Sequence, residues 1–555
     1  MCEDPLRSGS PLSIVPATGA NRVWTRPSSS YPDSLTRAIS QMHYDSSITP
    51  RTTRRVAALF TLLAGTAVAQ TPLGNVPIPL PGNLDTFVKS RPAAIRLGKA
   101  LFWDTQTGGD GRVACATCHF HSGVDSRTTN TVNPGPDHVF DGVPSPGGTL
   151  GGADFPIAGD NIVGSQGVVR ADFVALDPNN PLAADQCTLV DDGIFFPNRQ
   201  VTGRNAPSTI MAIFNRDNFW DGRAKREFNG VTPGGQVDPR PTILVDTGTG
   251  PVAKSVILQP ASAASQAVGP PNNGTEMSCT GRTFPLLGRK LLGRQPLALQ
   301  VVANDDSVLG KLSQEPNPGL STTYPDMVRA AFVADLHRAG MSQMEDNFSF
   351  FWGVAVMLYE STLIPSDSPF DHFAAGNASA LSSAQQAGMQ IFNSRGRCSH
   401  CHGGSTFSGA TIVGGGGDDF ANTGVTPTAA DGGRQPENAG KFKTPTLRNV
   451  ELSGPYFHNG RYLTLRQVVE FYNRGGDVAN PQKSSQVRPL NLSETDKANL
   501  VEFMLSLTDE RVRFERAPFD HPSLDVPNGP SLGPVGAAGL AQPIETYLGA
   551  DPRAQ

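Results

Sequence analysis

Two short segments of this chain share the arrangement Cys-x-x-Cys-His, at residues 115–119 (CATCH) and 398–402 (CSHCH). In such a pentapeptide the two thiols add across the vinyl groups of a c-type haem, and the histidine coordinates the iron from the proximal side. A pair of zinc hooks is the alternative, but zinc needs four ligands close in space and no histidine directly after the second cysteine. The spacing therefore predicts two covalent haems c. The predicted attachment residues are Cys115, Cys118, Cys398 and Cys401, and the predicted iron ligands are His119 and His402.

Residues 51–69 have the pattern of a secretory signal. Three arginines are followed by a mostly apolar run and by small residues that form a cleavage site near Ala69. No later segment reaches the ~20 apolar residues of a membrane helix. We therefore expect a periplasmic protein without a membrane span. A translation start at Met42 would give a signal of ordinary length, and a genuine disordered extension is the other reading of the residues before it.

The net charge of the exported chain indicates which kinds of partner it favours. The segment 1–69 holds seven of the 45 basic residues and four of the 50 acidic residues, so the remainder carries a formal charge of −8. This argues against nucleic acid and mildly favours a basic partner such as a small cytochrome.

Two cysteines remain beside the haem motifs and Cys2, which precedes the signal. In an oxidising compartment Cys187 and Cys279 favour one disulfide between the loops that carry them, and two free thiols are the alternative.

Helical patterns precede both haem motifs and follow the second. Residues 93–102 and 384–392 precede the motifs, and Ser383 with Gln386 has capping-box spacing. Residues 493–507 form a later helix, and residues 344–362 form the strongest central one. The predicted fold is mostly α, with two cytochrome c-like haem domains and long loop insertions. The expected boundaries are 1–69 for the extension and signal, 70–375 for the first haem domain with insertions, 376–511 for the second haem domain, and 512–555 for a Pro-rich tail.

Further motifs resemble the bacterial di-haem cytochrome c peroxidases and their relative MauG. Residues 203–208 (GRNAPS) resemble the RNAP segment of that family, and residues 219–223 match its FWDGR motif. Residues 447–450 (LRNV) and 454–460 (GPYFHNG) resemble its LRN and PYFHDG segments. The resemblance implies that peroxide is handled at the N-terminal haem, held by His119, and that the C-terminal haem, held by His402, relays electrons.

The resemblance also implies roles for residues between the haems. Trp220 matches a family tryptophan that can pass electrons between the haems, although it can equally be a core residue. Asn205 matches a residue that binds Ca²⁺, with backbone carbonyls of Ser453 and Pro455, and oxygen ligands suit that ion. Glu276 resembles the distal carboxylate that transfers protons during peroxide cleavage. An ordinary loop glutamate is the alternative, since the stretch before Glu276 is longer than usual in the family.

Distal iron ligands distinguish the members of the family. Peroxidases place a methionine fourteen residues after the histidine of the PYFHDG segment, and here that position is Tyr472, on the apolar face of a predicted helix. MauG uses a tyrosine there, and haem iron accepts tyrosine. Met504 is the main substitute, His458 is a weaker one, and an inward-packed tyrosine is the alternative without a ligand role. For the first haem, His121 and His138 follow the motif, but neither has a convincing position for a distal ligand.

These observations favour a periplasmic di-haem oxidoreductase that reacts with hydrogen peroxide at the first haem. A MauG-like enzyme would oxidise a protein or small-molecule substrate through Trp220. A conventional cytochrome c peroxidase would instead draw electrons from a small cytochrome. Two further alternatives remain, a di-haem oxygenase that uses O2 and a pure electron-transfer cytochrome in which a histidine closes the first haem.

Overall fold

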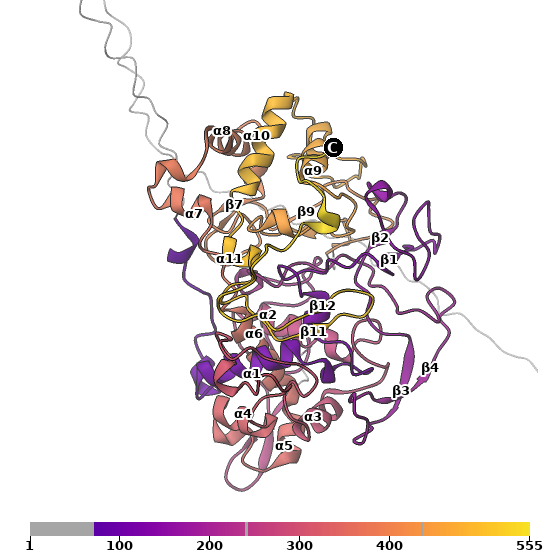
Figure 1. The fold of residues 1–555 in the computed structure, drawn as a ribbon, viewed down its shortest axis with the longest axis vertical. Helices are drawn as coiled ribbons and strands as arrows, with labels where there is room; N and C mark the ends of the chain where they lie inside the picture. Colours follow the sequence, from indigo (N-terminus) through magenta and orange to yellow (C-terminus); the bar gives the residue numbers. More distant parts are fainter. Residues whose placement is uncertain (1–70, 239–241, 435–436) are drawn as a thin grey trace, which may run out of the picture. The chain divides into compact units, whose positions relative to one another are not determined.

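The computed structural model describes residues 71–238, 242–434 and 437–555, all within the compact unit Val68–Gln555 (Figure 1). The expected signal segment and the start at Met42 lie outside the described residues. Within the described ranges, none of the helices combines the length and the apolar character needed to cross a membrane. The described α-helices are α1 (Arg91–Trp103), α2 (Ser262–Ala267), α3 (Phe284–Leu292), α4 (Tyr324–Ala331), α5 (Met341–Asp346), α6 (Phe348–Glu360), α7 (Pro369–Ala374), α8 (Ser383–Asn393), α9 (Leu465–Arg474), α10 (Glu494–Leu505) and α11 (Glu510–Arg513).

Helix α6 is the centre of the first half of the chain, and all of its residues are buried. It packs against α1 and α2, which lie beside it in Figure 1. The crossing with α1 is very close, because a Cβ on Gly98 would lie 1.9 Å from the Ala355 carbonyl oxygen. The prediction of a single helix over residues 344–362 is wrong in one respect. The helix is interrupted at Asn347, which separates α5 from α6. The Asn347 side-chain amide donates to the carbonyls of Leu244 and Leu336, which ties the break to a neighbouring strand and turn.

The second half has the same plan around α8 and α10, which lie side by side in Figure 1. A Cβ on Gly388 of α8 would lie 1.9 Å from the Asn499 carbonyl oxygen, so this crossing also requires glycine. Helix α10 is capped by Ser493, as predicted. Helix α8 is capped by Ser382 with Gln385, one residue earlier than the predicted pair.

In the part of the chain that the structure describes, the strands form only two-stranded antiparallel ladders, and long irregular segments separate the regular elements. The expectation of a mostly α fold therefore holds for the packed core but not for the loops. The paired strands are β1 (Val132–Asn133) with β2 (Ile162–Val163), β3 (Ala171–Ala175) with β4 (Gln186–Leu189), β5 (Ile243–Asp246) with β6 (Pro251–Lys254), β7 (Gly403–Gly404) with β8 (Gly415–Gly416), β9 (Phe420–Ala421) with β10 (Phe442–Lys443), and β11 (Leu524–Asp525) with β12 (Ser531–Leu532).

A disulfide joins Cys187 of β4 to Cys279, which confirms the favoured pairing. The bond closes a loop of 92 residues and tethers the β3–β4 hairpin to the segment that carries Glu276. The hairpin also pairs with this segment directly, because the Phe173 N–H donates to the Thr280 carbonyl at 2.9 Å.

The C-terminal segment packs on the first half of the chain. The Ser523 N–H donates to the Val301 carbonyl at 2.8 Å, and Leu524 and Val526 enter the large apolar core around α6. Further along, the Tyr547 hydroxyl donates to the Arg127 carbonyl at 3.1 Å. Residues from the end of the chain thus cover the neighbourhood of the first haem motif.

A buried ion pair joins three separate segments near the second haem motif. Arg448 Nη1 lies 2.5 Å from Asp371 Oδ2, and both side chains are almost completely buried. The other Asp371 oxygen accepts the Leu73 N–H at 2.9 Å. Burial alone would raise the pKa of Asp371, but the Arg448 charge and these hydrogen bonds hold that pKa below its usual value.

We expect Asp371→Asn to lower the free energy of unfolding by about 3–5 kcal/mol at pH 7, because it leaves the Arg448 charge buried and unpaired. A carboxyl with a depressed native pKa stabilises the fold above its unfolded pKa of about 4 and loses this effect as pH falls through the native value. The difference between wild type and variant should therefore shrink near pH 3 in urea unfolding curves. Asp85→Asn is the matched control, since its pair with Arg91 is exposed. A variant as stable as wild type at pH 7 would contradict this assignment.

Candidate haem sites

The second Cys-x-x-Cys-His motif opens onto a cavity of about 230 Å³. Cys398 and Cys401 lie at the 3₁₀ turn η12 (Cys398–His400), and both line this cavity together with His402. His402 Nδ1 lies 3.1 Å from the Pro445 carbonyl and 3.2 Å from the Phe407 carbonyl. Burial lowers the pKa of His402 to about 4, so the ring is neutral. With Nδ1 protonated toward these carbonyls, Nε2 is free to bind a metal.

The polar lining of this cavity suits a haem. Arg397, Lys443 and Arg448 line it, and none of its described lining residues is Asp or Glu. The Arg397 Nε, Asn449 Nδ2 and His458 Nε2 atoms are buried without a hydrogen-bond partner. The two carboxylates of a haem would supply acceptors and neutralising charge for such groups. The residues present therefore fit a covalent haem at this motif.

The first motif is built in the same way. Cys115 and Cys118 lie on the 3₁₀ turn η4 (Cys115–Cys118), in which the Ala114 N–H donates to Thr117 Oγ1 at 2.9 Å. His119 Nδ1 lies 2.8 Å from the Gly123 carbonyl, and burial lowers the pKa of this ring. The turn and the fixed Nδ1 leave His119 Nε2 as the nitrogen that can bind iron.

Tyr472, on α9, lines the cavity of the second motif with His402. Burial raises the pKa of the Tyr472 phenol, and the neighbouring Cys401 and Cys398 sulfurs raise it further. Met504, on α10, lines the same cavity. His458 also lines it, but its ring stacks on Phe442 with centroids 3.5 Å apart.

Trp220 lines the same cavity and is fixed at both its side chain and its backbone. Its indole N–H donates to the Asn205 carbonyl at 2.8 Å, and its own carbonyl accepts the Lys443 N–H at 2.7 Å. The indole ring lies 6.3 Å from the His458 ring.

The predicted calcium ligands lie along one wall of this cavity, since Asn205, Ser453 and Pro455 all line it. The Asn205 N–H donates to the His458 carbonyl at 2.7 Å, and Asn205 Nδ2 donates to the Val163 carbonyl at 3.2 Å. Asn205 thus connects the first half of the chain to the segment that contains Ser453 and Pro455.

Glu276 lies near the first motif, although it is far from it in sequence. Its charge raises the pKa values of the Cys115 and Cys118 thiols, and the adjacent Met277 packs with Val113 against Cys115. Burial raises the pKa of the Glu276 carboxyl, and Arg223 offsets this only in part. Glu276 is therefore a carboxyl near the first haem motif whose pKa lies above its usual value.

The two histidines that follow the first motif line neither the cavity at the second motif nor a smaller cavity of about 40 Å³ that His119 lines. His138 is exposed, and His121 lies against Phe120 with its Nε2 buried and without a partner.

Glu360 was not predicted from the sequence as a site residue. It is the only ionisable carboxylate in α6, it is buried, and its Oε2 has no hydrogen-bond partner. Burial raises its pKa to about 8, and its charge also raises the pKa of Cys115. A single carboxylate in an otherwise apolar helix is the sequence signal that could have identified it.

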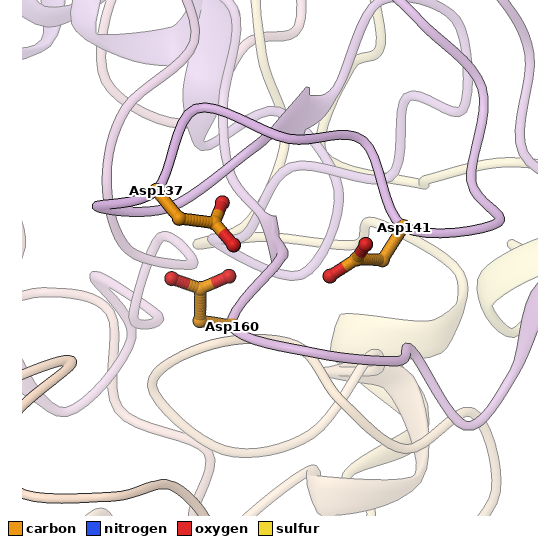
Figure 2. A group of neighbouring side chains, drawn as sticks. All are labelled: Asp137, Asp141 and Asp160. Carbon is orange, nitrogen blue, oxygen red and sulfur yellow. The ribbon is translucent and has the colours of Figure 1, made fainter.

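Three carboxylates converge in the loops around β1 and β2 (Figure 2). Asp137, Asp141 and Asp160 each offer an oxygen within 4.8 Å of the others. Two of them are exposed and Asp160 is half-buried. Exposed acidic groups commonly occur without an ion, so this cluster alone identifies no metal site.

Comparisons with known proteins agree with the two motifs. A family model described as di-haem cytochrome c peroxidase matches residues 92–379, just over half of the chain. The cytochrome-c peroxidase IdrP1 of Denitromonas iodatirespirans is 33% identical over 186 residues, which cover 28% of this chain and 49% of the relative. The methylamine utilization protein MauG of Methylorubrum extorquens is 30% identical over 159 residues, which cover 28% and 43%.

Longer matches are less similar. The cytochrome c551 peroxidase of Pseudomonas aeruginosa is 28% identical over 316 residues, covering 56% of this chain and 66% of the relative. The crystal structure of the dihaem peroxidase BthA of Burkholderia thailandensis is 18% identical, with a TM-score of 0.42, covering 80% of this chain and 91% of that one. The chain spans about half the length of the first curated relatives that it matches. Because the family model covers more than half of the chain, the chain belongs to the di-haem cytochrome c peroxidase family.

Proposed function

We propose that the chain is a periplasmic di-haem oxidoreductase that reduces hydrogen peroxide at the haem held by His119. The observation that carries this proposal is the Glu276 carboxyl, whose pKa is raised, beside the first haem motif of a di-haem peroxidase family member. When bound, each haem supplies an iron that exchanges single electrons, and the iron at an open site also binds peroxide. The signal pattern in the sequence of residues 51–69 supports the location, and the proposed haem domains span residues 70–375 and 376–511.

Glu276 acts as the proton carrier in this proposal. With a haem held by His119, the Glu276 carboxylate would accept a proton from peroxide and return it to the departing oxygen, which would leave as water. Burial raises the pKa of this carboxyl above its usual value, which makes it a stronger proton acceptor than an exposed glutamate. The disulfide at Cys279 and the bond from the Gly109 N–H to the Met277 carbonyl (2.7 Å) hold the segment near the motif.

Tyr472 is the distal ligand of the haem held by His402 in this proposal, which makes the protein MauG-like. A phenolate favours ferric and higher oxidation states, whereas a thioether such as that of Met504 favours ferrous iron. A tyrosine-ligated haem would accept electrons poorly from an ordinary cytochrome and would help to hold two oxidising equivalents. The shared cavity of Tyr472 and His402 supports this choice.

Trp220 is the electron route to an oxidisable protein or small-molecule substrate, and its two hydrogen bonds favour a fixed indole orientation. Asn205, Ser453 and Pro455 offer oxygen ligands that suit a Ca²⁺ ion. An ion bound there would hold Asn205 in place, and the Asn205 carbonyl accepts the Trp220 indole N–H. A conventional peroxidase with a small basic cytochrome as donor is the second candidate, favoured by the charge of −8 on the exported chain.

We expect Glu276→Gln to slow the reaction of ferric protein with hydrogen peroxide by about 10²–10⁴-fold, because the amide cannot take up the peroxide proton. Stopped-flow absorbance of the haem band measures the rate. Glu315→Gln is the control, since Glu315 is exposed. An unchanged rate in the Glu276 variant would remove this residue from the reaction.

A stoichiometric titration of fully ferric protein with peroxide tests the role of Tyr472. The wild type should give a rapid and long-lived absorbance change, whereas Tyr472→Met should react only after one haem is reduced and should then turn over with a reduced cytochrome. Met504→Leu should behave as wild type. If Met504→Leu shifts the spectrum and Tyr472→Met does not, Met504 is the ligand and the conventional peroxidase is correct.

A further inference from the structure

Buried aromatic side chains connect His119 to the interior of the first half of the chain. The Phe102 ring lies 6.3 Å from the His119 ring and 5.4 Å from the Tyr359 ring, measured between centroids. The Trp103 indole N–H donates to the Tyr359 hydroxyl at 3.1 Å. These four residues line one small cavity of about 40 Å³ on the His119 side of the motif. Tyrosine and tryptophan can be oxidised by one electron, and neighbouring rings here are separated by at most 6.3 Å between centroids or joined by a hydrogen bond.

The indole of Trp103 also contacts the C-terminal segment. The His521 ring stacks on it in a nearly parallel arrangement, with centroids 4.8 Å apart and planes at 10°. His521 Nε2 lies 3.0 Å from Glu515 Oε2, and its Nδ1 lies 2.8 Å from the Pro522 carbonyl. Both partners only accept hydrogen bonds, so the ring carries two protons. Burial lowers the pKa of His521, but the bond to Glu515 outweighs this and raises it.

The charges around Trp103 do not oppose the removal of an electron from it. His521 is neutralised by Glu515, and Lys99 Nζ lies 2.8 Å from Asp306 and 3.5 Å from Asp520, all fully buried. Three carboxylates thus accompany two cations. Burial and the Asp520 charge raise the pKa of Asp306, and even with Asp306 protonated the charges balance.

We propose that Trp103 is an internal electron donor to the haem held by His119, reached through Tyr359 and Phe102. This inference rests on the proposed function, because peroxide is the oxidant. Peroxide takes two electrons and two protons and gives two waters. When no external reductant is present, Trp103 supplies one of these electrons, a haem iron would supply the other, and the two protons come from solvent. Trp103 then remains as an indole cation radical with its N–H bonded to Tyr359. An external donor later returns the electron.

The test is freeze-quench electron paramagnetic resonance of the ferric, haem-loaded protein after one equivalent of peroxide, with absorbance of the haem band recorded in parallel. Protein with indole-deuterated tryptophan identifies a tryptophan radical through its narrower signal. Trp103→Phe is compared with Trp352→Phe, a buried tryptophan of α6 whose N–H donates instead to the Ala267 carbonyl at 2.9 Å. Mass spectrometry of wild-type peptides locates oxidised tryptophan without any substitution, so the result does not depend on the variant folding.

We expect a deuterium-sensitive radical that is lost in Trp103→Phe and kept in Trp352→Phe, and oxygen addition at Trp103 in the wild type. A haem band that responds to peroxide while the radical persists in Trp103→Phe, or oxidation found only at Trp220, overturns the internal donor and leaves the proposed function intact. A haem band that does not respond in wild type overturns the proposed function, and the internal donor with it.

Discussion

Each haem motif depends on a helix crossing at which a glycine backbone touches the partner helix. Gly98 meets Ala355 in the first half, and Gly388 meets Asn499 in the second, with any Cβ placed 1.9 Å from a carbonyl oxygen in both cases. The close crossing lets the helix that precedes the motif share a core with a later helix of similar length. Since α1 and α8 lead into the motifs, this contact sets where the cysteines and the proximal histidine emerge.

The two haem motifs have different electrostatic surroundings. Near the first motif lie two carboxyls whose pKa values are raised by burial, Glu276 and Glu360, and the pKa of Glu360 rises to about 8. The described lining of the cavity at the second motif contains Arg397, Lys443 and Arg448 and no carboxylate. Arg448 is already paired with Asp371, so Arg397 and Lys443 are the cations of this lining that a haem carboxylate could neutralise. In the proposed function, protons are handled at the first motif, and a phenolate from Tyr472 would stabilise the oxidised second haem.

Local patterns in the sequence predicted the features that depend on neighbouring residues. The Cys-x-x-Cys-His motifs, the Ser493 cap and the packed helical core needed only spacing and periodicity, and the compartment suggested the pairing of Cys187 with Cys279. The break at Asn347 could not be predicted from local patterns. Its side-chain amide donates hydrogen bonds to carbonyls about 100 and 11 residues away in sequence.

Contacts between segments that are distant in sequence could likewise not be predicted from hydrophobic periodicity. The stacking of Trp103 on His521 joins α1 to the C-terminal segment, and Glu276 approaches Cys115 only because the intervening loops fold back. Such contacts depend on tertiary packing, which no local pattern encodes. The roles of Tyr472 and Asn205 rested on a family resemblance, because a tyrosine or an asparagine alone has no distinctive spacing.

In the proposed function, the first haem is open and the second is closed by a ligand from the protein. Cyanide binds only to an open ferric iron, so a spectroscopic titration of the fully ferric protein with cyanide distinguishes the two haems. We expect rapid binding of one cyanide for every two haems. Binding to neither haem would indicate an electron-transfer cytochrome with both irons closed, and rapid binding to both would contradict a Tyr472 ligand.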